Sequence, residues 1–83
     1  MTLRIVDDFF QESEIVVVRG TRVTWINDGE NLHTVTSGSV SADVWDSGLL
    51  KTGQQSAHTF TTNGQFAYLC KVHEFMNGTV RVI

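Results

Sequence analysis

Apolar and polar residues alternate over short stretches of this chain, which is the pattern of half-buried β-strands. Between residues 22 and 26, Val23 and Trp25 fall on one face and Thr24 on the other. β-Branched and aromatic residues dominate such stretches, and none of the longer segments has helical periodicity. The pattern predicts strands at residues 3–10, 15–18, 22–26, 33–36, 56–62, 65–70 and 79–83.

Turn-forming sequences separate these predicted strands. They are Asn27-Asp28-Gly29, Ser37-Gly38-Ser39, Asn63-Gly64 and Asn77-Gly78. The longest connection, residues 37–55, contains no proline, and we expect it to be mobile or to hold a short edge strand around residues 43–46. Several short strands at close spacing indicate an all-β antiparallel sandwich or barrel. With 83 residues and no linker, the chain is predicted to form a single domain over residues 1–83.

Composition then excludes several classes of protein. A formal net charge of −3 and the lack of a basic tract argue against nucleic acid as the main partner. One cysteine cannot form an internal disulfide, and the longest aliphatic run, residues 15–18, is too short to cross a membrane. The N-terminus has no signal-peptide pattern, so we expect either a cytoplasmic protein or a mature form.

The candidate chemistry lies in a Cys70-x2-His73-x2-Met76 motif and in His33, far upstream. The start of a His-Glu-x-x-His protease motif at His73 fails because Asn77 stands in place of the second histidine. A structural zinc site would need four Cys or His ligands. Two imidazoles, a thiolate and a weak thioether instead suit copper that changes between Cu(II) and Cu(I). The alternative is that the cysteine and methionine only fill the core.

These residues carry a resemblance to a known family. The segments that carry it are residues 18–27, His33-Thr34-Val35-Thr36-Ser37, Asp46-Ser47-Gly48, His58-Thr59-Phe60, residues 64–70 and residues 76–82. In this order, together with the Cys-His-Met motif, they resemble the cupredoxins, the small blue copper proteins of the plastocyanin and amicyanin group. The short spacing between His73 and Met76 is similar to the amicyanin-type loop.

The resemblance implies a Greek-key β-sandwich of about seven to eight strands that binds one copper ion. It implies that His33, Cys70 and His73 are the equatorial ligands and that Met76 is the axial ligand. The expected function is electron transfer by a type 1 centre cycling between Cu(II) and Cu(I), without enzymatic activity. The alternatives are a copper carrier or storage module and a non-redox β-sandwich interaction domain.

The resemblance also implies where partners bind and where the protein works. Redox partner proteins are expected to dock near His73 and Phe75, and the protein is expected to be a monomer with no transmembrane segment. A periplasmic or otherwise extracytoplasmic location fits the family, and a cytoplasmic one stays open.

Three further features lead to separate expectations. Val72 stands where many relatives have proline, and we hypothesise that its amide donates to the Cys70 sulfur and raises the reduction potential. His58 is expected to be a hydrogen-bonded histidine at the sandwich edge, with a second metal site there as the minor alternative. The acidic cluster of Asp7, Asp8, Glu12 and Glu14 is predicted to be a solvated end of the sandwich, or a surface that steers a basic partner.

Overall fold

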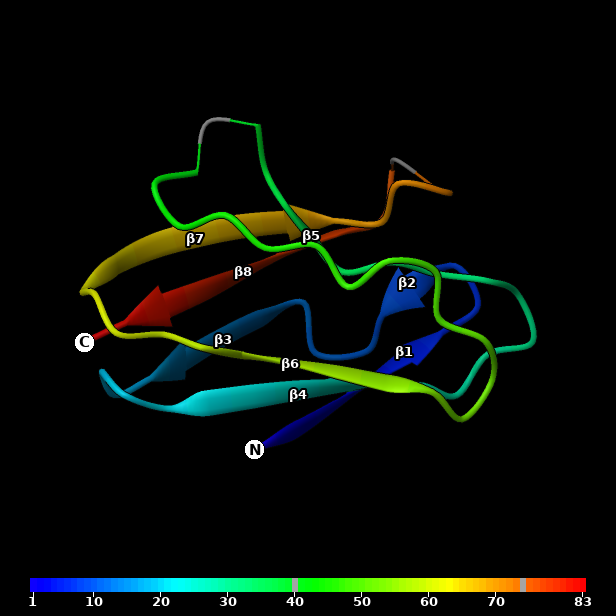
Figure 1. The fold of residues 1–83 in the computed structure, drawn as a ribbon, viewed down its shortest axis with the longest axis horizontal. Helices are drawn as coiled ribbons and strands as arrows, with labels where there is room; N and C mark the ends of the chain where they lie inside the picture. The colour runs from blue at the N-terminus through cyan, green and yellow to red at the C-terminus, as the bar shows by residue number, and fades with distance from the viewer. Residues whose placement is uncertain (40, 74) are drawn as a thin grey trace.

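Two four-stranded β-sheets pack face to face in the computed structural model, which describes residues 1–39, 41–73 and 75–83 (Figure 1). One sheet has the order β2-β1-β4-β6, with β1 at Thr2–Val6, β2 at Phe9–Phe10, β4 at Arg22–Asn27 and β6 at Gln55–Thr59. The other has the order β3-β8-β7-β5, with β3 at Glu14–Val17, β5 at Thr36–Ser37, β7 at Gly64–Leu69 and β8 at Asn77–Val82. The predicted all-β sandwich is confirmed.

Strand pairing is mixed in each sheet. β1 runs parallel to β4 and β3 runs parallel to β8, whereas the other pairs are antiparallel. Within the described residues the chain changes sheet at every connection from β2 to β7, and only β1–β2 and β7–β8 are consecutive strands that share a sheet. No helix in this part of the chain is long and apolar enough to span a membrane.

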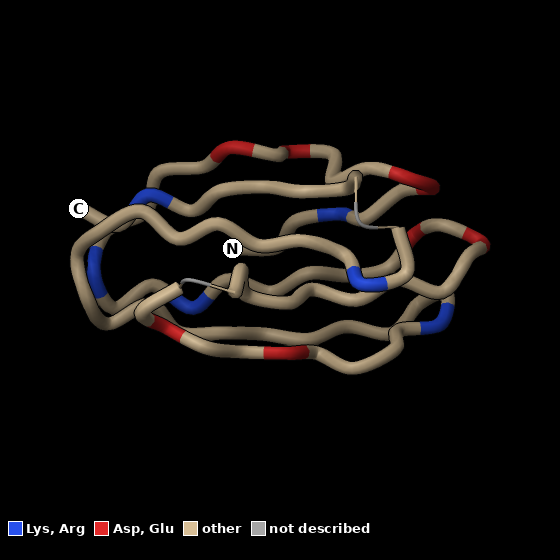
Figure 2. The backbone as a smooth tube through the Cα atoms, turned by 90° about the horizontal axis from the view of Figure 1, so that it is seen from above, with Lys and Arg blue, Asp and Glu red and all other residues tan. Residues whose placement is uncertain are grey.

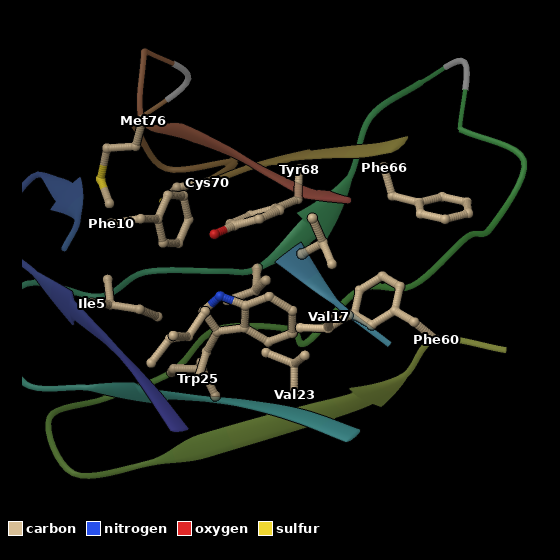
Figure 3. Packing of buried hydrophobic residues seen from close by; sticks show 14 of the residues in the cluster. Ile5, Phe10, Val17, Val23, Trp25, Phe60, Phe66, Tyr68, Cys70 and Met76 are labelled. Atoms are coloured by element: carbon tan, nitrogen blue, oxygen red, sulfur yellow. The ribbon is translucent and has the colours of Figure 1, made fainter. Parts of the chain in front are cut away.

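The core lies between the two sheets because alternate residues of β4 and β7 point inward. In β4, Val23 and Trp25 are buried as the alternation predicts, and in β7 the same holds for Phe66 and Tyr68. Figure 3 shows the Trp25 and Tyr68 rings facing each other across the layers; their centroids lie 5.2 Å apart at 66°. Trp45 stacks on Trp25 at 6.3 Å, so both tryptophans pack the core as expected.

The predicted strand over residues 3–10 is wrong, because a tight turn divides it. β1 ends at Val6, the chain reverses at Asp7 and Asp8, and β2 pairs back on β1 with Phe9 opposite Val6. The Asp8 amide donates to the Val6 carbonyl at 3.0 Å, which closes the turn. The apolar pattern hid this break because Phe9 and Phe10 continue the run of strand-forming residues on the far side of the turn.

Three other predictions need correction. The predicted strand over residues 33–36 is replaced by β5, and His33 itself forms an isolated bridge with Leu50. The edge strand expected at residues 43–46 is reduced to one bridge between Thr36 and Asp46. Asn77-Gly78 was predicted as a turn, but both residues begin β8 because they pair with the end of β7.

The loop that joins β7 to β8 and the turn between β1 and β2 lie at the same end of the sandwich, opposite the C-terminus (Figure 1). Figure 2 shows the Lys and Arg positions spread among the Asp and Glu positions along the tube. The cations of the described residues therefore form no single basic stripe. The candidate ligands Cys70, His73 and Met76 lie in the loop that joins β7 to β8.

Candidate metal centre

The Cys-His-Met motif forms a closed loop between β7 and β8. Cys70 directly follows β7, and Met76 directly precedes β8. The Cys70 amide donates to the Met76 carbonyl at 3.1 Å, and the Met76 amide donates to the His73 carbonyl at 2.8 Å. Because β7 and β8 are antiparallel neighbours, these bonds hold both ends of the loop at one place on the sheet. Glu74 lies outside the described residues.

His33 approaches the Cys-His-Met loop from a distant part of the sequence, the segment between β4 and β5. It exchanges two backbone hydrogen bonds with Leu50, of 3.2 and 2.8 Å, and it is completely buried. Its Nδ1 lies 3.8 Å from the Cys70 sulfur, and its ring centroid lies 5.2 Å from that of His73. The predicted residues His33, Cys70 and His73 therefore present donor atoms that all lie within 4.8 Å of one another.

Two further observations fit these donors to a metal. His73 Nδ1 is buried and has no hydrogen-bond partner within the described part of the chain, which leaves this nitrogen without a polar contact from the protein. Met76 is 2% exposed, and its side chain points from the loop into the core (Figure 3). Two imidazoles and a thiol beside a thioether are the donor set of trigonal copper sites. The residues present therefore fit a copper ion.

The amide that donates to the Cys70 sulfur belongs to Thr34, at 3.4 Å. The hypothesis that Val72 supplies this donor is not supported, since the described residues include no hydrogen bond from the Val72 amide to that sulfur. Thr34 directly follows His33, so its amide reaches the buried thiol from the segment before β5 and not from the Cys70 loop. Thr34 and Cys70 are 36 positions apart, so no local pattern indicated this donor.

A ring of hydrogen bonds joins the chain around His33 to the chain around Cys70. The Lys71 amide donates to the Thr34 hydroxyl at 2.9 Å, and the Thr34 and Thr36 hydroxyl oxygens lie 3.0 Å apart. The Thr36 hydroxyl donates to Asp46 at 3.1 Å, and the Lys71 ammonium pairs with the same carboxylate at 2.5 Å. Lys71 accordingly holds the pKa of Asp46 below its usual value. This ring fixes the spacing between two of the candidate ligands.

Two carboxylates of the predicted solvated cluster also lie against the imidazoles. Asp7 Oδ1 is 3.0 Å from His33 Nε2, and Asp8 Oδ1 is 3.5 Å from His73 Nε2. The hydrogen bond from His33, followed by those from the Glu30 and Asn31 amides, lowers the pKa of Asp7 to about 2. Asp7 and Asp8 are exposed, as predicted for a solvated end of the sandwich, but the prediction did not include their contacts with the imidazoles. No local signal marked them, because they contact residues far away in the sequence.

His58 lies away from this end and has a partner of its own. Its Nε2 is 2.8 Å from Asp43 Oδ2, and its ring stacks on Trp45 with centroids 4.6 Å apart. The expectation of a hydrogen-bonded histidine at the sandwich edge is confirmed. Asp43 was not identified from the sequence because it lies on the connection before β6, outside the strand that carries His58.

Known proteins with the same features are found by sequence and by fold. The chain matches the profile of the copper-binding proteins of the plastocyanin/azurin family over residues 5–83. It is 33% identical over 76 residues to Amicyanin-alpha of Methylorubrum extorquens, a match that covers 88% of this chain and 63% of that protein. The chain thus spans slightly less than two thirds of this curated relative.

Solved structures show the same fold. The purple cupredoxin of Nitrosopumilus maritimus superposes with a TM-score of 0.88 at 28% identity, covering 99% of this chain and 98% of that one. An oxidized amicyanin variant superposes with a TM-score of 0.92 at 28% identity, covering 100% of this chain and 81% of that one. The resemblance to cupredoxins is confirmed, and copper is the cofactor that the family and the donor set indicate. The chain belongs to the plastocyanin/azurin family of copper-binding proteins.

Proposed function

We propose that this protein carries single electrons between redox partner proteins through one type 1 copper centre. The observation that supports the proposal is the convergence of the His33, Cys70 and His73 donors within 4.8 Å, with Met76 closing the same loop. In this proposal His33, Cys70 and His73 are the equatorial ligands and Met76 is the axial one. A copper ion bound there supplies a one-electron Cu(II)/Cu(I) couple.

The protein's own part is to hold the donors still and to keep water away. His33 and Cys70 are fully buried and Met76 is nearly so, while both ends of the loop are fixed by backbone hydrogen bonds. Donors held in this way need little rearrangement when the charge of the site changes. No bond is made or broken by the protein, which is why we propose a carrier and not an enzyme.

Electrons would enter and leave through His73. Of the four proposed ligands it is the one with a substantially exposed side chain, at 23%. Phe75, 70% exposed, lies beside it with the ring centroids 6.0 Å apart, and the neighbouring Val72 is also exposed. An apolar surface around an exposed ligand edge suits brief contact with a partner, because little polar surface must be desolvated.

The proposal is tested by voltammetry and by the electron self-exchange rate of the copper-loaded protein. We expect a reversible one-electron wave and fast self-exchange. Phe75→Asp should slow self-exchange by about tenfold, within the range over which interface substitutions change association rates. Val18→Asp is the matched control, because Val18 is 64% exposed and precedes the turn between β3 and β4 at the opposite end of the sandwich.

Two results would contradict the proposal. An irreversible wave together with rapid loss of Cu(I) to a chelator would favour a copper carrier or storage module. Equal slowing by Phe75→Asp and Val18→Asp would remove the docking role of the surface beside His73. We further propose, from family membership alone, that the protein works outside the cytoplasm, which cell fractionation would test.

A further inference from the structure

The turn between β1 and β2 places one carboxylate against each imidazole of the proposed copper site. Asp7 Oδ1 meets His33 Nε2 at 3.0 Å, and the other nitrogen of that ring, Nδ1, faces the Cys70 sulfur at 3.8 Å. The ring is therefore held from both sides. When Nε2 donates its proton to Asp7, the lone pair on Nδ1 points toward the thiol, which is the arrangement of carboxylate–histidine–metal sites.

Asp8 approaches the second imidazole. Its Oδ1 lies 3.5 Å from His73 Nε2, while His73 Nδ1 is buried and has no hydrogen-bond partner among the described residues. Asp8 adopts a φ of +89°, in the left-handed region that residues other than glycine rarely occupy. Such backbone strain persists where the surroundings fix it, and it gathers at functional sites. Here it accompanies a turn that presents two adjacent carboxylates to two different rings.

The surroundings of Asp7 are shaped for its carboxylate. The Glu30 amide donates to Oδ2 at 2.9 Å and the Asn31 amide donates to Oδ1 at 3.0 Å, in addition to the His33 contact. Gly29 leaves the space free, because a Cβ there would lie 2.1 Å from Asp7 Oδ1. Three N–H donors occupy these oxygens, so the carboxylate acts as a hydrogen-bond acceptor and is a poor candidate for binding a further cation.

We propose that Asp7, assisted by Asp8, is a positioning residue that orients the imidazole ligands and lowers the reduction potential of the copper site. This inference rests on the proposed function. A negative charge next to a ligand ring favours the more highly charged Cu(II) over Cu(I). A carboxylate partner also makes the imidazole a more basic ligand.

The first test measures the reduction potential of copper-loaded variants. Asp7→Asn keeps the shape and an acceptor oxygen but removes the charge. Glu14→Gln is the matched control, because it removes one charge from an exposed residue on β3. If Asp7→Asn weakens Cu(II) binding about tenfold more than Cu(I) binding, at the low end of outer-shell effects, the potential rises by ~59 mV. A potential equal to that of Glu14→Gln would overturn the charge effect.

The second test needs no copper and separates this inference from the proposed function. Long-range ¹H–¹⁵N NMR at mildly alkaline pH reports which ring nitrogen of His33 carries the proton in the apoprotein. We expect a single tautomer protonated at Nε2 in the wild type and in Asp7→Asn, and a mixture of tautomers in Asp7→Ala. A mixture in the wild type, or an unchanged single tautomer in Asp7→Ala, would overturn the positioning role. Failure of the wild type to give a reversible wave would count against the proposed function alone.

Discussion

The Thr34 hydroxyl is the structural link between the two ligand-bearing segments, and Thr34→Val removes it with little change of shape. Thr34 is 2% exposed. Its oxygen accepts from the Lys71 amide at 2.9 Å and lies 3.0 Å from the Thr36 hydroxyl. Thr36 keeps its bond to Asp46 in the variant. The main loss is therefore the acceptor for the Lys71 amide.

The expected cost follows from the partial burial of this contact, in which the Thr34 side is buried. Leaving a donor without its acceptor at such a place costs up to ~1–3 kcal/mol. Thr34→Val should therefore lower the free energy of unfolding of the apoprotein by that amount. This is a large share of the marginal stability of a small domain, about 5–15 kcal/mol.

Urea denaturation of the apoprotein measures the effect. We expect a lower midpoint and an unchanged m-value, because the surface exposed on unfolding hardly changes. Thr34→Ser should retain most of the stability, because it keeps the hydroxyl. Thr59→Val is the control: Thr59 is exposed, and its hydroxyl makes no hydrogen bond within the described residues. A midpoint for Thr34→Val equal to that of Thr59→Val would refute the role of the ring.

Three further predictions concern stability. Gly78→Ala should cost ~1–3 kcal/mol through overpacking, because its Cβ would lie 2.4 Å from the Tyr68 ring; an unchanged melting temperature would contradict this. Asp46→Asn should lower the free energy of unfolding by less than ~1 kcal/mol, because the ion pair of Asp46 with Lys71 is exposed. A larger loss in urea denaturation would contradict this and would mean that the carboxylate supports more of the hydrogen-bond ring. The third concerns pH: the contacts of Asp7 lower its pKa from 3.8 to about 2, so its ionised form stabilises the fold above pH 4 and this contribution is lost as pH falls from 4 to 2. The stability gap between wild-type apoprotein and Asp7→Asn should close over that range, and a gap that persists at pH 2 would be inconsistent with this pKa.

Much of the fold was predictable because it depends on local alternation. The inward faces of β4 and β7 follow from the period of two that places Val23 with Trp25 and Phe66 with Tyr68. The positions of the breaks were less predictable. Asp7 and Asp8 interrupt an apolar run that resumes at Phe9, and Asn77 and Gly78 have turn composition but pair with β7. In these cases tertiary pairing prevails over composition.

At the copper site, too, the local features were predictable from the sequence and the long-range contacts were not. Cys70, His73 and Met76 are close in sequence, so their spacing indicated a metal loop with the distant His33 as a further imidazole, and the resemblance assigned the four residues their ligand roles. Their supporting contacts were not predictable, because Asp7 meets His33 across 26 positions and the Thr34 amide meets Cys70 across 36. Such contacts depend on how the turn between β1 and β2 and the segment before β5 fold against the β7–β8 loop.

The most direct test of the central claim is to add Cu(II) to the apoprotein and record its visible absorption spectrum. Equatorial ligation by Cys70 predicts an intense thiolate-to-copper charge-transfer band at one copper per chain, giving a coloured protein. Cys70→Ser should lose the band, whereas Glu14→Gln should keep it. A colourless Cu(II) complex of the wild type, or a band that survives in Cys70→Ser, would contradict the account.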